Sequence, residues 1–209
     1  MSRMKYILAG LVLLLPLSVQ SASIVEGFEY KRIVPAQQTQ APGGKIEVVE
    51  LFWYGCPHCY RFEPSLQKWL KNKPDDVVFI RIPAQMNPGW VIHAQAFYTA
   101  EALGVSDKMH HKIFDAMHKN NRKLNTADEI AALFVENGIG RKKFDKAFNS
   151  FGVKTKMANA RGMVQRYGAH SVPTIIVNGK YRSDATMAGG THQDLVNVIN
   201  FLINKERSK

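Results

Sequence analysis

The two cysteines of this 209-residue chain, Cys56 and Cys59, are its only ones, and two residues separate them. They follow the apolar run 48–55 and open a stretch with helical periodicity. A disulfide between them would close so small a loop that it would restrict the unfolded chain little. A cysteine pair between a buried strand and a helix N-terminus is instead suited to thiol–disulfide exchange.

We expect Cys56 in the first turn of the helix, where free N–H groups and the helix dipole favour a thiolate. His58 adds a donor or a positive charge beside this anion, and Pro57 suits a first helical position. A low pKa makes Cys56 both a nucleophile and a good leaving group. Cys59 is expected to be less exposed and to resolve the mixed disulfide. The alternative is that His58 is an ordinary surface residue and Pro57 only a helix starter.

Other uses of a CxxC motif fit this chain less well. Haem attachment requires a histidine directly after the second cysteine, where the chain has Tyr60. A structural zinc site requires two more ligands, and the sequence has no second cysteine pair. Four histidines lie on predicted helices without a coherent ligand set, and we expect them on a solvated face: His93, His110, His111 and His118. We therefore expect a redox-active cysteine pair with no metal and no other cofactor.

Glu50 stands inside the apolar run that precedes the cysteines. A carboxylate in a strand covered on both faces is costly to bury, so a function is expected for it. One such function is to accept or relay the proton of Cys59 as that thiol becomes a thiolate. Arg81, at the end of the next predicted strand, is a candidate partner. A charge at a sheet edge or a purely structural ion pair remains the alternative.

Val172 and Pro173 directly precede a β-branched run, 174–177. A proline at this place is often an ordinary strand boundary. In a thioredoxin arrangement it is a cis-proline facing the cysteines, and the backbone of Val172 can pair with an extended substrate segment. Aromatic residues flank the cysteines and are expected either in the core or on an apolar surface for unfolded polypeptides: Trp53, Tyr54, Tyr60 and Phe62.

The predicted elements follow the order β-α-β, a block of helices, then β-β-α. The first part comprises a strand over 46–54, a helix from the cysteines to about residue 71 with a kink at Pro64, and a strand over 77–82. Helices are expected over 91–103, 108–119, 126–137, 141–151 and 154–167, with Thr126 and Glu129 forming a capping box. The strand 174–177, the turn Asn178-Gly179, residues 180–182 and a helix over 193–203 complete the pattern.

This order predicts an α/β, thioredoxin-like fold with an inserted helical domain. We expect 23–86 and 153–209 to form the thioredoxin-like domain and 87–152 the inserted helices.

The N-terminus has the pattern of an export signal. Arg3 and Lys5 precede an apolar stretch over 6–19, and small residues follow at 21–23. This stretch is too short to span a bilayer comfortably, which predicts a signal peptide over 1–22 that is removed, with an uncleaved anchor as the alternative.

The charge is +11 for the whole chain and, with 26 basic against 17 acidic residues, +9 without Arg3 and Lys5. A basic exported protein suits anionic surfaces or acidic polypeptides. Nucleic acid is not expected as a partner, because no basic run is interleaved with aromatic residues. The basic cluster 141–143 is expected on a solvated helix face.

Glu50, the Cys56-Pro57-His58-Cys59 motif, the following residues 60–63 and Val172-Pro173 together resemble the DsbA family of periplasmic thiol:disulfide interchange proteins. The resemblance implies a strongly lowered cysteine pKa and an oxidising couple, both known for that family. It also implies oxidation of newly exported, unfolded proteins in the periplasm and recycling by a quinone-linked inner-membrane partner.

Arg81 departs from the lysine that pairs with the buried glutamate in the family. An arginine does not readily give up its proton, so we expect charge pairing but no proton relay there. The segment between the predicted signal and residue 46 is too short for a dimerisation domain, so a monomer is expected. Two other functions remain open: a disulfide isomerase or reductase, and a redox-switched peptide-binding chaperone.

Overall fold

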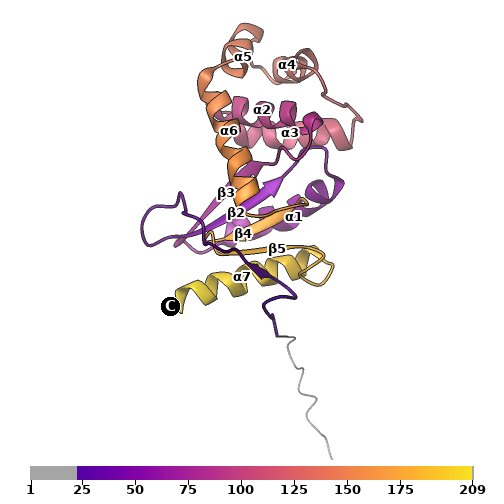
Figure 1. Ribbon diagram of the computed structural model, residues 1–209. Coiled ribbons are helices and arrows are strands. Elements are labelled where there is room, and N and C mark those ends of the chain that lie inside the picture. The colour runs from indigo at the N-terminus through magenta and orange to yellow at the C-terminus, as the bar shows by residue number, and fades with distance from the viewer. Residues whose placement is uncertain (1–22, 209) are drawn as a thin grey trace, which may run out of the picture.

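The computed structural model describes residues 23–208, so the predicted signal peptide 1–22 lies outside the described residues. Its centre is a sheet of five strands in the order β1-β5-β4-β2-β3 (Figure 1). β2 and β3 are parallel, and the other neighbours are antiparallel. The strands are β1 Lys31–Arg32, β2 Ile46–Phe52, β3 Val77–Pro83, β4 Thr174–Val177 and β5 Tyr181–Asp184. The short β1 was not predicted, because two polar residues carry no strand pattern.

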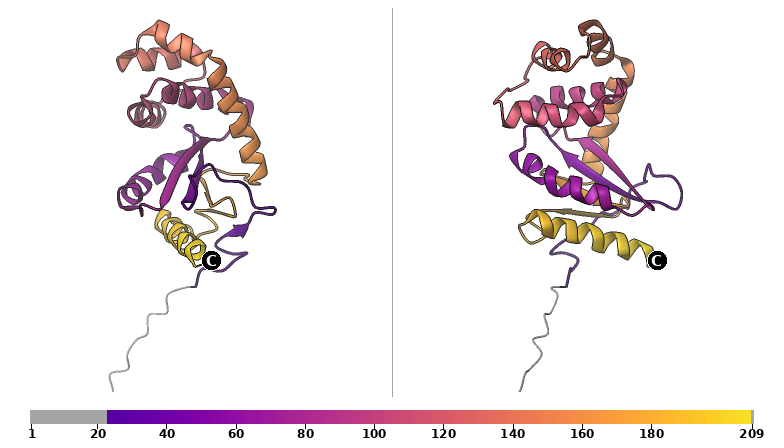
Figure 2. Two further views of the ribbon diagram at one scale, coloured as in Figure 1. Left: turned by 90° about the vertical axis from the view of Figure 1, so that its left-hand side faces the viewer. Right: turned by 180° about the vertical axis from the view of Figure 1, so that it is seen from behind.

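The helices lie on both faces of the sheet and beyond one end of it. They are α1 Pro57–Asn72, α2 Pro88–Ala102, α3 Ser106–His118, α4 Ala127–Glu136, α5 Arg141–Phe148, α6 Phe151–Arg166 and α7 His192–Arg207. α1 and α7 cover one face and α6 the other, while α4 and α5 lie farthest from the sheet (Figure 2). Within residues 23–208, no helix combines the length and apolar composition needed to cross a bilayer.

The central strand β2 explains where the core lies. All its residues are buried, because β3 and β4 flank it and helices cover both faces. Alternate residues of a strand face opposite sides. Val48 packs with residues of α1 and α7, whereas Val49 and Leu51 pack with residues of α6. Glu50 therefore faces the side of α1, and its register partner across the parallel pair is Arg81.

A third apolar cluster joins the sheet to the helices α2–α5. It contains Phe52 and both cysteines together with Phe114 and Phe134. The cysteine pair thus lies at the junction between the sheet and the inserted helices. The predicted domain boundary at 152/153 falls inside α6, which begins at Phe151 and continues without interruption to the sheet. The division into two domains stays a prediction.

Several local predictions are confirmed. Asn178 and Gly179 form the predicted turn, with φ values of 51° and 64°, and Lys180 N donates to Val177 O at 3.0 Å. The register pairs Val177 with Tyr181, so the loop between β4 and β5 has three residues rather than two. A Cβ at Gly179 would lie 2.1 Å from the carbonyl oxygen of Gln37, so only glycine fits.

Some helix limits differ from the predictions. α1 continues through Pro64, and α5 ends at Phe148, after which Ser150 caps α6. α7 extends to Arg207, beyond the predicted end at 203. The prediction ended too early because the last turn of the helix is polar and does not continue the apolar pattern.

The capping box at the start of α4 gives a stability prediction. Thr126 Oγ accepts from Glu129 N at 3.2 Å, and Glu129 Oε2 accepts from Thr126 N at 3.1 Å. Thr126→Ala should lower the free energy of unfolding by about 1 kcal/mol, because it leaves a helix N–H without its acceptor. Urea denaturation measures this. Thr155→Ala, at an exposed position inside α6, is the matched control, and an equal loss there would contradict the assignment.

Candidate active site

The cysteines occupy the first turn of α1. Cys56 is the N-cap, with φ −85° and ψ 116°, Pro57 follows in the first turn, and Cys59 lies within it. Cys56 is 7% exposed and Cys59 is fully buried. Both are free thiols, so the structure describes the reduced state. Cys59 is the less exposed of the two thiols, as the sequence predicts.

The pKa of Cys56 is lowered to about 6, chiefly by a hydrogen bond from the Cys59 thiol. The backbone N–H groups of Cys59 and His58 add to this effect, and burial opposes it. Cys59 N lies 3.5 Å from Cys56 Sγ, and no acidic residue occupies the first turn of α1. The pKa of Cys59 is raised well above its ordinary value by burial and then by Cys56 and Glu50. The negative charge therefore resides on Cys56.

His58 contributes to the site mainly through its backbone. Its side chain is exposed, and its Nδ1 accepts from Arg61 Nη2 at 3.1 Å. The charge of the ring has a smaller effect on the pKa of Cys56 than the backbone N–H groups have. The helix N-terminus, rather than the imidazole, is the larger source of stabilisation.

Val172 and Pro173 lie against the cysteines although more than a hundred residues separate them in sequence. The Val172–Pro173 peptide bond is cis, and Cys56 Sγ donates to Val172 O at 3.3 Å. Pro173 is buried and Val172 half-buried. The structure thus brings the predicted backbone segment beside the reactive sulfur.

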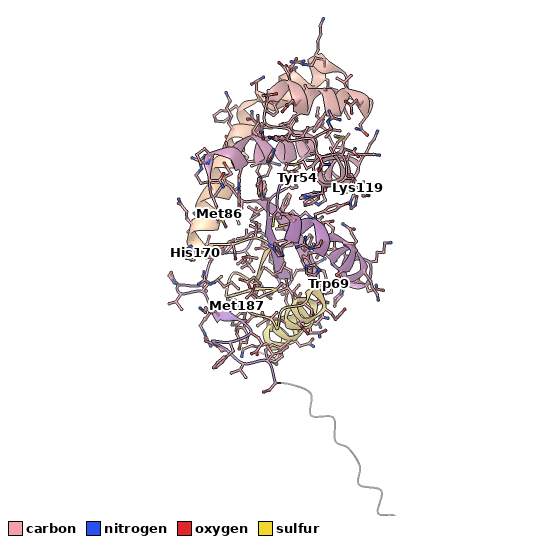
Figure 3. The ribbon with its side chains drawn as sticks, turned by 90° about the vertical axis from the view of Figure 1, so that its right-hand side faces the viewer. Tyr54, Trp69, Met86, Lys119, His170 and Met187 are labelled. Carbon is pink, nitrogen blue, oxygen red and sulfur yellow. The ribbon has the colours of Figure 1, made fainter. Side chains whose placement is uncertain are left out.

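The aromatic residues around the cysteines divide between core and surface. Tyr54 and Phe62 are buried, and Tyr54 lies between the sheet and the inserted helices (Figure 3). Trp53 is half-buried and stacks on Trp90 with ring centroids 4.4 Å apart. A Cβ at Gly55 would lie 2.2 Å from the Trp53 ring, so only glycine allows this packing next to Cys56.

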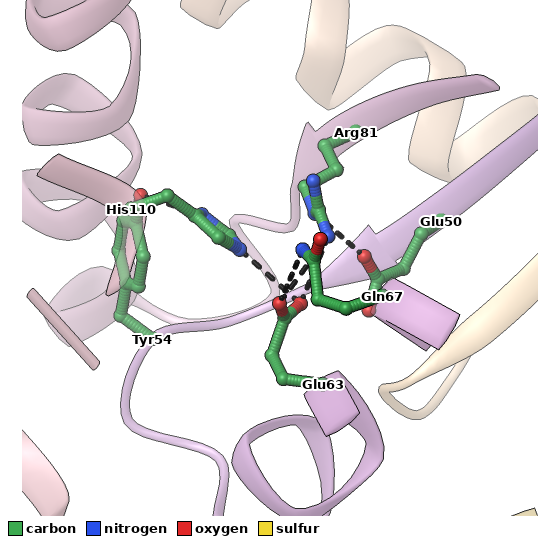
Figure 4. Close-up of polar contacts among 6 residues, drawn as sticks. All are labelled: Glu50, Tyr54, Glu63, Gln67, Arg81 and His110. Carbon is green, nitrogen blue, oxygen red and sulfur yellow. Dashed lines mark hydrogen bonds and ion pairs between the residues drawn. The ribbon is translucent and has the colours of Figure 1, made fainter. Parts of the chain in front are cut away.

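A buried charge cluster joins β2, β3, α1 and α3 (Figure 4), and the charge of its member Glu50 raises the pKa of Cys59. Arg81 Nε donates to Glu50 Oε2 at 3.1 Å, which is the predicted pair, and Arg81 Nη2 donates to Glu63 Oε1 at 3.0 Å. His110 Nε2 lies 3.2 Å from Glu63 Oε1, and Tyr54 Oη lies 3.1 Å from His110 Nδ1. The edge-charge alternative for Glu50 is wrong, since its strand lies between β3 and β4 and its side chain is buried.

Sequence reasoning missed Glu63 and His110. A signal for Glu63 was present: it follows Cys59 by four residues and so lies on the same face of α1. His110 carried no such signal, because its partners come from other elements.

The predicted solvated face of histidines is wrong for His93 and His110, which are buried, and His118 is half-buried. His93 Nδ1 accepts from Trp53 Nε1 at 2.9 Å, and His118 Nε2 lies 2.7 Å from Tyr54 O. Of the four, only His111 is exposed. These rings turn inward because each finds polar partners near the segment preceding Cys56. No group of metal-binding side chains occurs among residues 23–208.

The thiol geometry predicts the titration of the reduced protein. Cys56 should ionise at about pH 6, as followed by the ultraviolet absorbance of the thiolate. Because the Cys59 thiol is the leading donor, Cys59→Ala should raise this pKa, while Cys59→Ser, which keeps a hydroxyl donor, should raise it less. Ionisation near the ordinary value of about 8.5 in the unaltered protein would contradict the site.

The same shift makes stability depend on pH. A thiol whose pKa is lower in the folded state stabilises that state above its unfolded pKa, and the gain is lost as the pH falls through about 6. The difference in unfolding free energy between the reduced protein and Cys56→Ser should therefore grow from pH 6 to about pH 8.5.

The chain resembles known proteins over most of its length. A family model described as a DSBA-like thioredoxin domain matches residues 81–197, a range that begins after the cysteine motif. The thiol:disulfide interchange protein DsbA of Azotobacter vinelandii is 47% identical over 191 residues, covering 91% of this chain and 88% of that protein. The protein of the same name from Pseudomonas aeruginosa is 42% identical and covers 92% and 90%.

Solved structures agree with the sequence comparison. The crystal structure of Pseudomonas aeruginosa DsbA is 42% identical with a TM-score of 0.84, covering 88% of this chain and 95% of that chain. The structure of the oxidoreductase DsbA from Xylella fastidiosa is 32% identical with a TM-score of 0.82, covering 90% and 99%. The predicted thioredoxin-like fold is confirmed, and this chain belongs to the DsbA-like family of thioredoxin-fold proteins.

Proposed function

We propose that this protein is a thiol:disulfide oxidoreductase that donates a Cys56–Cys59 disulfide to newly exported proteins through a mixed disulfide at Cys56. The observation that carries this proposal is the opposite pKa shift of the two thiols in one helical turn. Stabilising the thiolate stabilises the reduced protein, so the disulfide form is the stronger oxidant.

The exchange proceeds in two steps. A client thiolate attacks Cys56 Sγ of the disulfide, the S–S bond breaks, and Cys59 takes the electron pair and then a proton. A second client thiolate attacks the client sulfur of the mixed disulfide, and Cys56 leaves as a thiolate. The client loses two electrons and the protein gains them, with one proton retained on Cys59 and the other released to solvent.

Glu50 supplies the proton that Cys59 needs in the first step. Burial raises the pKa of Glu50 to about 8, so it is mostly protonated at neutral pH, and its charge affects the pKa of Cys59. Arg81 positions the carboxyl group and keeps its own proton. Glu50 then regains a proton from those that the client thiols release, so both Glu50 and Cys59 are protonated in the reduced protein. During reoxidation Glu50 relays the proton of Cys59 to solvent as that thiol becomes the attacking thiolate.

Val172 and Pro173 bind the client. The backbone of Val172, which contacts Cys56 Sγ, pairs with an extended client segment, and the half-buried rings of Trp53 and Tyr60 offer apolar contacts. Such contacts suit unfolded polypeptides because they require no particular sequence.

The remaining assignments follow the same proposal. The protein acts as a monomer in the periplasm after removal of the signal peptide 1–22, and a quinone-linked inner-membrane protein reoxidises it. It uses no cofactor besides the cysteine pair and binds no nucleic acid. Residues 87–152 form a helical domain inserted into the thioredoxin-like domain (23–86 and 153–209).

The oxidised protein should introduce disulfides into a reduced, unfolded test protein, and Cys56→Ser should abolish this activity. Cys59→Ser should instead be incubated with the test protein in its disulfide form, where the Cys56 thiolate attacks the client disulfide and releases one client thiolate. The mixed disulfide at Cys56 should then accumulate, visible by non-reducing electrophoresis and mass spectrometry, because Cys59 is not there to resolve it. Full activity of Cys56→Ser would contradict the proposal.

Equilibration with glutathione separates an oxidase from a reductase. A couple as reducing as that of thioredoxin, about −270 mV, is the result that would exclude the oxidase. Activity on scrambled disulfides tests the isomerase alternative in the same samples.

Glu50→Gln should slow the reaction of the oxidised protein with a monothiol peptide at neutral pH. The loss should reach about 100-fold, the lower end of what a positioned proton donor contributes. Stopped-flow measurements across pH 5 to 9 should show that the variant lacks the fall in rate that the wild type shows as Glu50 ionises near pH 8. Asp75→Asn, which changes an exposed carboxylate, is the control, and equal losses would exclude the assigned role.

A further inference from the structure

Two buried carboxyl groups share one guanidinium between β2, β3 and α1 (Figure 4). Glu50 on β2 and Glu63 on α1 both accept from Arg81 on β3, at 3.1 and 3.0 Å. Their side chains are only 1% and 7% exposed. Two carboxylates with one cation carry a net negative charge, which burial disfavours. Such a site holds one proton at neutral pH, and the question is which carboxyl group carries it.

The hydrogen bonds to the two carboxyl groups are unequal. Glu63 accepts from Arg81 through both oxygens, from Gln67 at 3.1 Å and from His110 at 3.2 Å. Glu50 accepts only from Arg81, and its Oε1 has no partner among residues 23–208. Hydrogen bonds to a charged form favour that form. Despite burial, the pKa of Glu63 is lowered to about 2, whereas burial raises that of Glu50 to about 8.

His110 on α3 has its orientation fixed from its other side. A carboxylate only accepts, so Nε2 of His110 carries the hydrogen that Glu63 receives. Nδ1 of the neutral ring then accepts from the Tyr54 hydroxyl at 3.1 Å. Burial keeps the pKa of His110 below its ordinary value. The rings of Phe52 and Phe114 pack against the imidazole at centroid distances of 5.3 and 5.0 Å.

We propose that His110 is a positioning residue that keeps the negative charge on Glu63 and thereby leaves the shared proton on Glu50, close to Cys59. The proposal rests on the hydrogen bond from His110 Nε2–H to Glu63. The Tyr54 hydroxyl, which donates to Nδ1, fixes the ring in the tautomer that can form this bond. Two further charged or titratable groups face this contact, Arg81 and the exposed neighbour His111. Gln67, which also donates to Glu63, is neutral. Only the consequence for Cys59 rests on the proposed function; the placement of the proton does not.

The direct test follows the two carboxyl groups by carbon NMR of the full-length mature protein labelled at glutamate side chains. Glu50→Gln and Glu63→Gln assign the signals. In His110→Phe the pKa of Glu63 should rise by about one pH unit or more, since a charge-assisted hydrogen bond is lost. Glu63 stays ionised at the pH where Glu50 titrates, so the pKa of Glu50 should change less, and the two values should approach each other mainly through the rise at Glu63.

His110→Gln is the matched variant, because its amide can donate from the position of Nε2. It should restore most of the separation between the two pKa values. His111→Phe makes the same replacement at the adjacent exposed position and should leave both values unchanged. Unchanged values in His110→Phe, or equal shifts in His110→Gln and His110→Phe, would overturn the proposal.

Tyr54→Phe provides a second route if His110→Phe does not fold. Without the hydroxyl the ring loses the partner that fixes its tautomer, so the pKa of Glu63 should rise in the same direction by a smaller amount. No rise in a folded Tyr54→Phe protein would contradict the role given to Tyr54. The NMR titration measures carboxyl pKa values whether or not the protein oxidises thiols. The role proposed for His110 can therefore be rejected without rejecting the proposed function.

Discussion

The negative charge that Cys56 holds in the reduced protein is the feature on which the rest of the site depends. A thiolate is stable there because the first turn of α1 directs the Cys59 thiol and backbone N–H groups at its sulfur. The same turn buries Cys59 completely, which keeps that thiol neutral. The start of α1 therefore favours a charged sulfur at Cys56 and an uncharged one at Cys59, although the two cysteines lie in the same helical turn.

The surrounding fold maintains this separation. β2 delivers the cysteines to the junction of the sheet and the inserted helices, and the loop before β4 places the Val172 carbonyl 3.3 Å from Cys56 Sγ. Beneath them, Arg81 balances two carboxyl groups that have different numbers of donors. Acid–base roles are commonly set in this way, by environments that move two similar groups apart in pKa. Here one carboxyl group keeps a proton near Cys59, while the other keeps its charge farther along α1.

Much of this was predictable from the sequence because the signals are local. The CxxC spacing, the Asn178-Gly179 turn and the Thr126–Glu129 capping box each involve neighbours in the chain, and each has the predicted geometry. The pairing of Glu50 with Arg81 was also within reach, since successive buried strands with a short crossover tend to be adjacent. The errors fall where a local pattern misleads. Histidines amid polar residues were expected in solvent, and α7 was expected to end where its apolar residues end.

The sequence by itself determined the chemistry: two thiols at the start of a helix, a carboxyl group in a buried strand and a proline before another. Only the tertiary structure decided the state of each group. Glu63 and His110 come from α1 and α3, Arg81 from β3 and Tyr54 from the segment before Cys56, and no spacing along the chain reveals that they meet. Protonation depends on burial and on the number of donors around each atom, and folding alone sets both.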